Sequence, residues 1–241
     1  MTVKICIGLF VTMTCMTLLL GAQTVMSINQ RLTVKQQSII PIAAYTAGGE
    51  LQELERALNK GLDAGLTVNE IKEVIVHLYA YCGFPRSIRG LQTFMEVLNE
   101  RKAKGINDKP GAEASPIKDE AVKYERGKNV LSELTNVKQD RPLSGYGAFA
   151  PVIDTFLKEH LFADLFERDV LTYAERELVT ISVLSSIGAA EPMLRSHFSI
   201  CLNVGLTPAQ LNEFVDVIKS SLGENEAGAA QAVLYEVLKN R

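Results

Sequence analysis

A carboxylate and an imidazole stand four residues apart in the first half of the chain, at Glu73 and His77. On a helix this spacing places both side chains on one face, within reach of each other. In a partly dry environment such a pair has shifted pKa values and can transfer protons. On an exposed face the same pair would only stabilise the helix, by about a few tenths of a kcal/mol. The burial of that face decides between the two.

The segment 67–84 is predicted to be one helix that is buried on both sides. At about 100° per residue, one face carries an apolar stripe: Ile71, Val74, Ile75, Leu78 and Cys82. The opposite side carries Glu73, His77, Ala80 and Phe84, with Val76 beside them and Tyr81 at the margin. A helix that is apolar nearly all round is buried on both faces. One face should therefore pack within its own unit and the other against a second unit.

The chain contains an internal repeat. Residues 61–101 align without a gap with 201–241, so that Gly-Leu-Thr at 65–67 meets Gly-Leu-Thr at 205–207. Each Thr begins a capping box that Glu70 or Gln210 completes, and each Gly can end the preceding helix in a left-handed conformation. The sequence thus predicts two homologous helical units, 31–101 and 145–241, joined by a linker at 102–144 whose Gly and Pro residues are typical of loops.

Two helices are predicted around this linker. A short one is expected near 119–134. The segment 149–168 is interpreted as an amphipathic helix, with one apolar side made of Phe149, Val152, Ile153, Phe156, Leu157 and Leu161. His160 lies on this segment and is expected at the surface or at an interface.

The composition of the chain excludes some classes of function. The 241 residues include 25 Lys and Arg and 28 Asp and Glu, for a formal net charge of −3. Nucleic-acid-binding domains are strongly basic, so no nucleic-acid partner is expected. Trp is absent and aromatic residues make up 7%, which favours helices packed by aliphatic side chains. No Cys/His spacing suits zinc, and we predict no metal site.

The N-terminal segment 1–22 is typical of a secretory signal, with Lys4, an apolar stretch and a small residue, Ala22, at the cleavage position. A membrane anchor is the alternative, but the stretch is shorter than the roughly 20 apolar residues of a span, and no stable span is expected. Cleavage would place the protein in the periplasm or outside the cell. Cys82 and Cys201 would remain, and could either pair or stay buried as free thiols.

The run His77-Leu-Tyr-Ala-Tyr-Cys-Gly-Phe-Pro85 resembles the carboxymuconolactone decarboxylase family. The second unit adds Phe149-Ala-Pro-Val-Ile-Asp154, then Glu175-Arg-Glu-Leu-Val-Thr-Ile181, then His197 eight residues before Gly205. The resemblance covers nearly all of the chain outside the signal and linker. It implies an all-α fold related to alkylhydroperoxidase D, with the two repeats forming a pseudo-dimer within one chain. It also implies a homo-oligomer, a trimer-like assembly of two-repeat chains.

One branch of that family consists of peroxidases with peroxiredoxin-type activity, which carry Cys-x-x-Cys-x-x-x-His. Counted back from His197, the two cysteine positions hold Ala190 and Met193. The first unit has Glu50 and Glu53 there, and Ala57 in place of the His. Thiol peroxidase chemistry needs an attacking thiolate and a resolving partner. It would be available only if Cys82 and Cys201 met as a redox pair.

The decarboxylase branch implies a cofactor-free lyase acting on a small carboxylated or lactone-like compound. Loss of carbon dioxide from such a lactone leaves a dienolate, which must be stabilised by hydrogen-bond donors and protonated on carbon. A non-catalytic oligomeric binding protein that has kept the fold is the remaining alternative.

The two units have kept complementary residues, so we expect one composite site per chain. The first unit keeps Glu73, His77 and Tyr81, and the second keeps Arg176, Glu177 and His197. In this hypothesis His197 donates the proton with Glu177 and Glu73 as neighbouring carboxylates, and His77 and Tyr81 stabilise the oxyanion. Arg176 would anchor a substrate carboxylate. The hypothesis requires His77 and His197 to lie close together.

Overall fold

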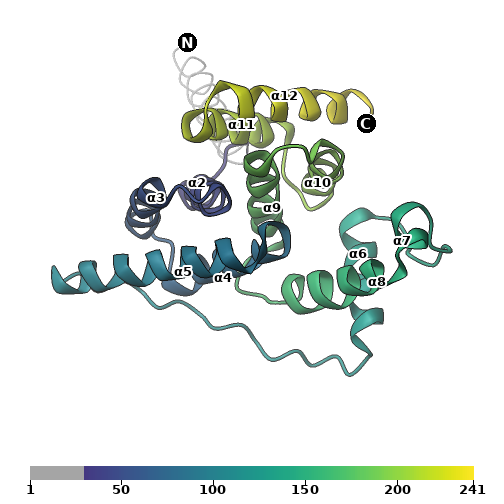
Figure 1. Cartoon of the computed structure of the whole chain (residues 1–241), viewed down its shortest axis with the longest axis horizontal. Coiled ribbons are helices and arrows are strands. Elements are labelled where there is room, and N and C mark those ends of the chain that lie inside the picture. Colours follow the sequence, from purple (N-terminus) through teal and green to yellow (C-terminus); the bar gives the residue numbers. More distant parts are fainter. Residues whose placement is uncertain (1–29) are drawn as a thin grey trace, which may run out of the picture.

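The structure is a computed structural model, and it describes residues 30–241. In this part of the chain all regular structure is helical, as the predicted all-α fold requires (Figure 1). The predicted signal segment, residues 1–22, lies outside the described residues. Among the helices of residues 30–241, none combines the length and the apolar character that a bilayer crossing needs.

The two repeats have the same order of helices. The first contains α2 (Val34–Gly48), α3 (Leu51–Asp63), α4 (Val68–His77) and α5 (Tyr79–Ala103), and the second α9 (Tyr173–Ile187), α10 (Glu191–Asn203), α11 (Pro208–Leu222) and α12 (Glu224–Lys239). The equivalent helices α2 and α9 pack side by side at the centre (Figure 1). Helix α4 packs on α9 and α11 packs on α2, so each repeat completes the other. One continuous apolar core includes residues of both repeats.

The predicted Gly-Leu-Thr joints are confirmed. Thr67 and Thr207 are the N-caps of α4 and α11, each with a complete capping box. Gly65 and Gly205 have φ angles of 93° and 100° and so occupy the left-handed region that favours glycine. These caps fix where each repeat turns, and thereby which faces of α4 and α11 meet the partner repeat.

The single helix predicted over 67–84 is wrong in its second half. Helix α4 ends at His77, and α5 begins at Tyr79 with a kink at Gly83, whose φ is 81°. Pro85 lacks an amide hydrogen and disfavours helix in the residue before it, so the chain changes direction here. The buried face therefore stops short of Phe84, which is 61% exposed.

The helix predicted around 119–134 is confirmed as α6 (Lys123–Thr135). The single amphipathic helix predicted over 149–168 is wrong. The chain instead forms α7 (Gly145–Phe149), α8 (Pro151–Phe156) and a π-helix, η1 (Leu157–Phe166). Pro151 has no amide hydrogen to continue α7, and the change of winding in η1 divides the predicted apolar stripe. Leu161 is buried, whereas Phe149 is 91% exposed.

Helix α6 is a packed part of the fold, although it falls in the predicted linker. It lies against η1, and the two share a small apolar cluster that includes Leu134 and Phe166. The helices approach so closely at Gly127 that a Cβ atom there would lie 1.7 Å from the carbonyl oxygen of Lys158. The inter-repeat helices α6, α7, α8 and η1 thus form a wall beside the two repeats (Figure 1).

Candidate functional site

A cavity of about 650 Å³ lies where the two repeats meet the wall of inter-repeat helices. Helix α5 contributes Tyr81, α10 contributes His197, and α6 and η1 contribute Leu131 and Phe162. Most of the lining is apolar, with a few polar groups among it. This volume and character are typical of small-molecule sites.

His197 is held in this cavity by a buried carboxylate. Its Nδ1 lies 2.7 Å from Oε2 of Glu177, and the His197 side chain is 13% exposed while that of Glu177 is fully buried. A carboxylate accepts, so Nδ1 carries the proton and Nε2 is left to react. The pair can therefore act as a base when the imidazole is neutral and as an acid when it is protonated. The other oxygen of Glu177, Oε1, has no hydrogen-bond partner.

Tyr81 brings a hydrogen-bond donor from the other repeat. Its ring centroid lies 5.9 Å from that of His197, with the two rings at 77°. Burial, together with the nearby charge of Glu177, raises the pKa of the Tyr81 phenol far above its ordinary value. Tyr81 therefore keeps its proton and can donate it in a hydrogen bond.

His77 lies behind Tyr81 and does not line the cavity. Arg176 Nη1, which can only donate, lies 3.3 Å from Nδ1 of His77, so Nε2 carries the proton and donates to the Thr180 hydroxyl at 3.0 Å. Thr180 in turn lies 3.1 Å from the Tyr81 hydroxyl. The ring centroids of His77 and His197 lie 5.5 and 5.9 Å from that of Tyr81, so the two histidines are close together. The predicted role of His77 as an oxyanion donor does not fit this arrangement, because both of its ring nitrogens are in use and it does not line the cavity.

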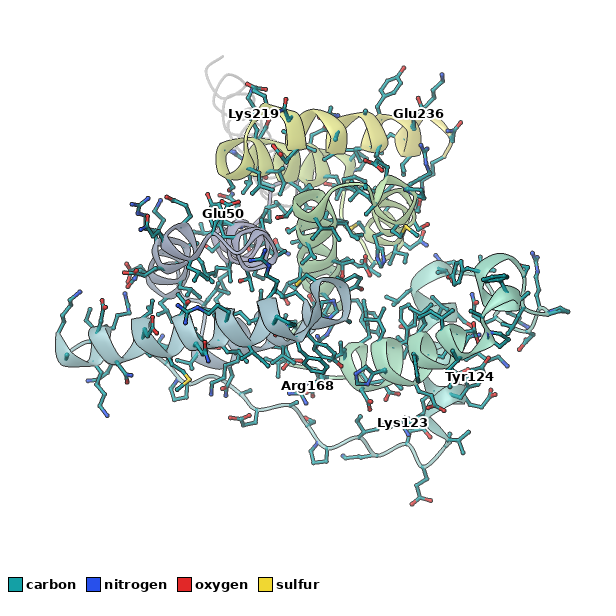
Figure 2. The ribbon with its side chains drawn as sticks, in the orientation of Figure 1. Glu50, Lys123, Tyr124, Arg168, Lys219 and Glu236 are labelled. Atoms are coloured by element: carbon teal, nitrogen blue, oxygen red, sulfur yellow. The ribbon has the colours of Figure 1, made fainter. Side chains whose placement is uncertain are left out.

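Glu73 forms an ion-pair cluster at the interface between the repeats. It accepts from Arg168 at 2.7 and 3.0 Å and from Arg176 at 2.8 Å. Figure 2 labels Arg168, which precedes α9. Burial alone would raise the pKa of Glu73, but the bonds from the two arginines lower it below its ordinary value. Glu73 does not line the cavity, so it does not contact a ligand there directly. Its contacts are with Arg168 and Arg176.

The prediction that Arg176 anchors a substrate carboxylate is wrong for this arrangement. Its side chain is fully buried, and besides Glu73 and His77 it donates to the backbone carbonyl of Arg168 at 2.6 Å. An arginine paired in this way is not available to a ligand. Its neighbours show that it holds α4 against α9.

The two cysteines are unsuited to the redox role considered for them. Both are free thiols, with Cys82 half-buried and Cys201 fully buried. Burial raises the pKa of the Cys82 thiol to about 11 and that of Cys201 well above its ordinary value. Because the thiolate is the reactive form, neither cysteine is activated at neutral pH.

Lys158 and Asp154, the other charged residues that line the cavity, are paired with each other. The Lys158 ammonium donates to both oxygens of Asp154 at 2.7 Å and to the Tyr124 hydroxyl at 3.0 Å. Tyr124, which belongs to α6, is labelled in Figure 2. His160 is half exposed, contacts Tyr79 and Asp164, and lies outside this cavity, as expected of a surface residue. Within residues 30–241, no cluster of His, Cys, Asp and Glu is arranged to hold a metal ion.

Two parts of the site were not found from the sequence. Thr180 could have been, because it follows Glu177 by three residues on the same helix and so lies on the same face. The wall formed by α6 and η1 could not have been found from the sequence, since Leu131 and Phe162 belong to no motif. Their position depends on how the inter-repeat segment folds back.

Comparison with known proteins agrees with the repeat structure. The model of the carboxymuconolactone decarboxylase family matches the chain twice, over residues 17–94 and 151–236. The chain is 29% identical over 119 residues to 4-carboxymuconolactone decarboxylase of Acinetobacter baylyi, covering 49% of this chain and 88% of that protein. It is also 26% identical over 73 residues to an uncharacterised protein of Methanocaldococcus jannaschii, covering 30% of this chain and 68% of that protein. The chain therefore belongs to the carboxymuconolactone decarboxylase family, as a form with two repeats.

Proposed function

We propose that the protein is a cofactor-free carbon–carbon lyase that decarboxylates a small carboxylated lactone by acid–base chemistry. The observation that carries the proposal is the Glu177–His197 pair, 2.7 Å apart, at the wall of a largely apolar cavity beside Tyr81. The likeness to a relative named 4-carboxymuconolactone decarboxylase supports this reaction class.

In the proposed reaction the bond between the ring carbon and the carboxylate breaks and carbon dioxide leaves. The electron pair of that bond passes into the ring and onto the lactone carbonyl oxygen as a dienolate. Tyr81 donates a hydrogen bond to this oxygen, and the protonated His197 delivers its Nε2 proton to a ring carbon. Glu177 stabilises the imidazolium before the transfer, and solvent then restores the proton.

The lining of the cavity suits the loss of a charged group. The two neighbouring cations, Arg176 and Lys158, are bound to Glu73 and Asp154. A substrate carboxylate would therefore lie against apolar walls instead of in a cationic clamp. Transfer from water to such surroundings disfavours the carboxylate relative to the more dispersed charge of the dienolate.

The test is carbon dioxide release from a panel of carboxylated γ-lactones, beginning with 4-carboxymuconolactone. His197→Gln removes the proton donor, so kcat should fall by about 10²–10⁴-fold. Tyr81→Phe removes one oxyanion donor, and kcat should fall by about 10²–10³-fold.

His160→Gln is the matched control, because it makes the same substitution at a histidine outside the cavity. Its kcat should equal that of the unmodified protein. Equal rates for the two His variants, or no turnover of any lactone in the panel, would count against the proposal.

A further inference from the structure

A second cavity, of about 340 Å³, lies across the repeat interface from the first. It is formed by α2 and α3 of the first repeat and α11 of the second. The first cavity uses the equivalent segments with the repeats exchanged, namely α9, α10 and residues 80–81, which lie at the start of α5 but align with residues 220–221 of α11. The two cavities are thus counterparts in the pseudo-symmetry of the chain.

Residue-by-residue alignment of the repeats shows what the second cavity has lost. Ala57 stands where His197 lines the first cavity, and Ser221 stands where Tyr81 does. Ser38 and Glu177 each follow the capping threonine of their helix by the same number of residues. Without the imidazole, the phenol and the carboxylate, this cavity has no group for the proposed proton transfer.

The same alignment shows what the second cavity has gained. Arg56 replaces Ser196 and Lys60 replaces Ile200, while Glu53 replaces Met193. Arg56 forms an ion pair with Glu53. Within residues 30–241, Lys60 has no acidic partner within ion-pair distance. The residues lining the second cavity therefore carry a net positive charge, from Arg56 and Lys60 against Glu53. The first cavity has no such excess, because Lys158 is matched by Asp154.

Most neutral donors of the second cavity are already used. The Tyr45 hydroxyl donates to the backbone carbonyl of Ser221 at 3.1 Å. The hydroxyls of Ser38 and Ser220 donate to carbonyls of their own helices at 2.9 and 3.0 Å. The polar contacts that remain for a ligand come from the two cations and from the Ser221 hydroxyl. Ala57 and Val217 offer apolar surface.

We propose that the second cavity is a non-catalytic binding site for a small organic carboxylate with an apolar body. The carboxylate pairs with Lys60 and with the guanidinium nitrogens of Arg56 that Glu53 does not use, because Glu53 is bonded to Nη1 alone and the Arg56 side chain is 65% exposed. The apolar body lies against Pro41, Ala57 and Val217. The apolar surface distinguishes this ligand from a fully hydrated anion such as inorganic phosphate. The site is independent of the lyase activity proposed for the first cavity.

The test is a titration of the isotopically labelled protein with benzoate, followed at the backbone amides of Ala57 and Val217 by NMR. Benzoate should bind saturably, while benzamide, its uncharged counterpart, and inorganic phosphate should bind about tenfold more weakly or not at all. Arg56→Gln with Lys60→Gln should weaken benzoate binding by at least about tenfold. Arg89→Gln with Lys102→Gln, the same exchange at exposed positions elsewhere, should leave it unchanged.

Two further variants separate the cavities. His197→Gln should leave the shifts at Ala57 intact, because it alters only the first cavity. Ala57→Leu should abolish binding although both cations remain, because the added side chain fills the apolar floor; its thermal midpoint reports whether it is folded. Unchanged benzoate binding in the Arg56/Lys60 variant or in folded Ala57→Leu, loss of binding in His197→Gln, or no saturable binding at all would overturn the proposal.

Discussion

His77 is a titratable ring enclosed on all sides. It is fully buried between Arg176, Thr180 and the rings of Tyr81 and Phe166. Its pKa is lowered well below the ordinary value of 6.5. The largest cause is burial, and the charges of Arg176 and His197 lower it further. The folded protein therefore keeps His77 neutral at pH values where the unfolded chain would protonate it.

This difference predicts a loss of stability in mild acid. Below pH 6.5 the unfolded chain binds a proton at His77 that the folded chain does not, so the free energy of unfolding should fall by up to about 1.4 kcal/mol per pH unit from this group. Urea unfolding between about pH 7.5 and about pH 5 measures it. In His77→Gln this part of the slope should vanish. The neighbouring Glu73 has a lowered pKa, and its contribution is lost only at more acidic pH.

His160→Gln serves as the control for this measurement, because His160 is half exposed. It should keep the slope of the unmodified protein. If His77→Gln and the unmodified protein instead gave parallel stability curves, His77 would titrate alike in both states and its neutral assignment would be wrong.

Sequence reasoning succeeded for single residues where one repeat could be compared with the other. The retention of His77 and Tyr81 in one repeat and His197 in the other pointed to their meeting in space. It failed for Arg176, because the residue type suggests a ligand anchor, whereas tertiary packing supplies Glu73 as its partner. No local pattern reports a partner about a hundred residues away.

At the scale of elements, the wall formed by α6 and η1 depends on one close approach. A side chain at Gly127 would collide with the backbone of Lys158, which cannot move aside as a flexible side chain could. Gly127→Ala should therefore push the two helices apart and lower the free energy of unfolding by about 1–3 kcal/mol. Chemical denaturation measures this change.

Gly228→Ala is the matched control, because Gly228 lies in α12 and an added Cβ there meets nothing within 4 Å. In this exposed helical position alanine should be neutral or stabilising by up to about 1 kcal/mol. A stability loss in Gly127→Ala no larger than that of the control would mean that α6 and η1 are not packed as described.

Helices whose ends are marked by capping residues in the local sequence were predicted well. Thr67 and Thr207 mark helix starts through contacts within one turn, and Gly65 and Gly205 mark ends, so local sequence suffices. The segment 149–168 was predicted less well, because its apolar spacing fits an α-helix while Pro151 and the packing of η1 on α6 impose other geometry. A π-helix has no comparable signature in a single sequence.

At the scale of the whole molecule, a row of large apolar side chains remains exposed beside the wall. Phe149, Val152 and Phe156 are 91%, 57% and 59% exposed. Val152 and Phe156 are one turn apart on α8, and Phe149 is at the end of the preceding helix α7. Exposed apolar patches often mark interaction surfaces, and we propose that these side chains are covered in the trimer-like homo-oligomer predicted from the sequence.

Sedimentation analysis measures this directly. The unmodified protein should sediment as an oligomer of two-repeat chains, and Phe149→Ser with Phe156→Ser should shift it toward the monomer. Tyr235→Ser, at an equally exposed aromatic residue on α12, should not. A monomeric unmodified protein, or a double variant that assembles normally, would refute the proposal.

The covalent joining of the two repeats has a consequence for how their cavities can change. In a dimer of identical single-repeat chains, every mutation is inherited by both cavities at once, so a change that improves binding in one is forced on the other. In this chain the residues that line each cavity are encoded separately. Ala57 and His197 occupy counterpart positions and differ in chemistry. With both repeats in one chain, the two cavities can therefore carry different side chains and bind different ligands.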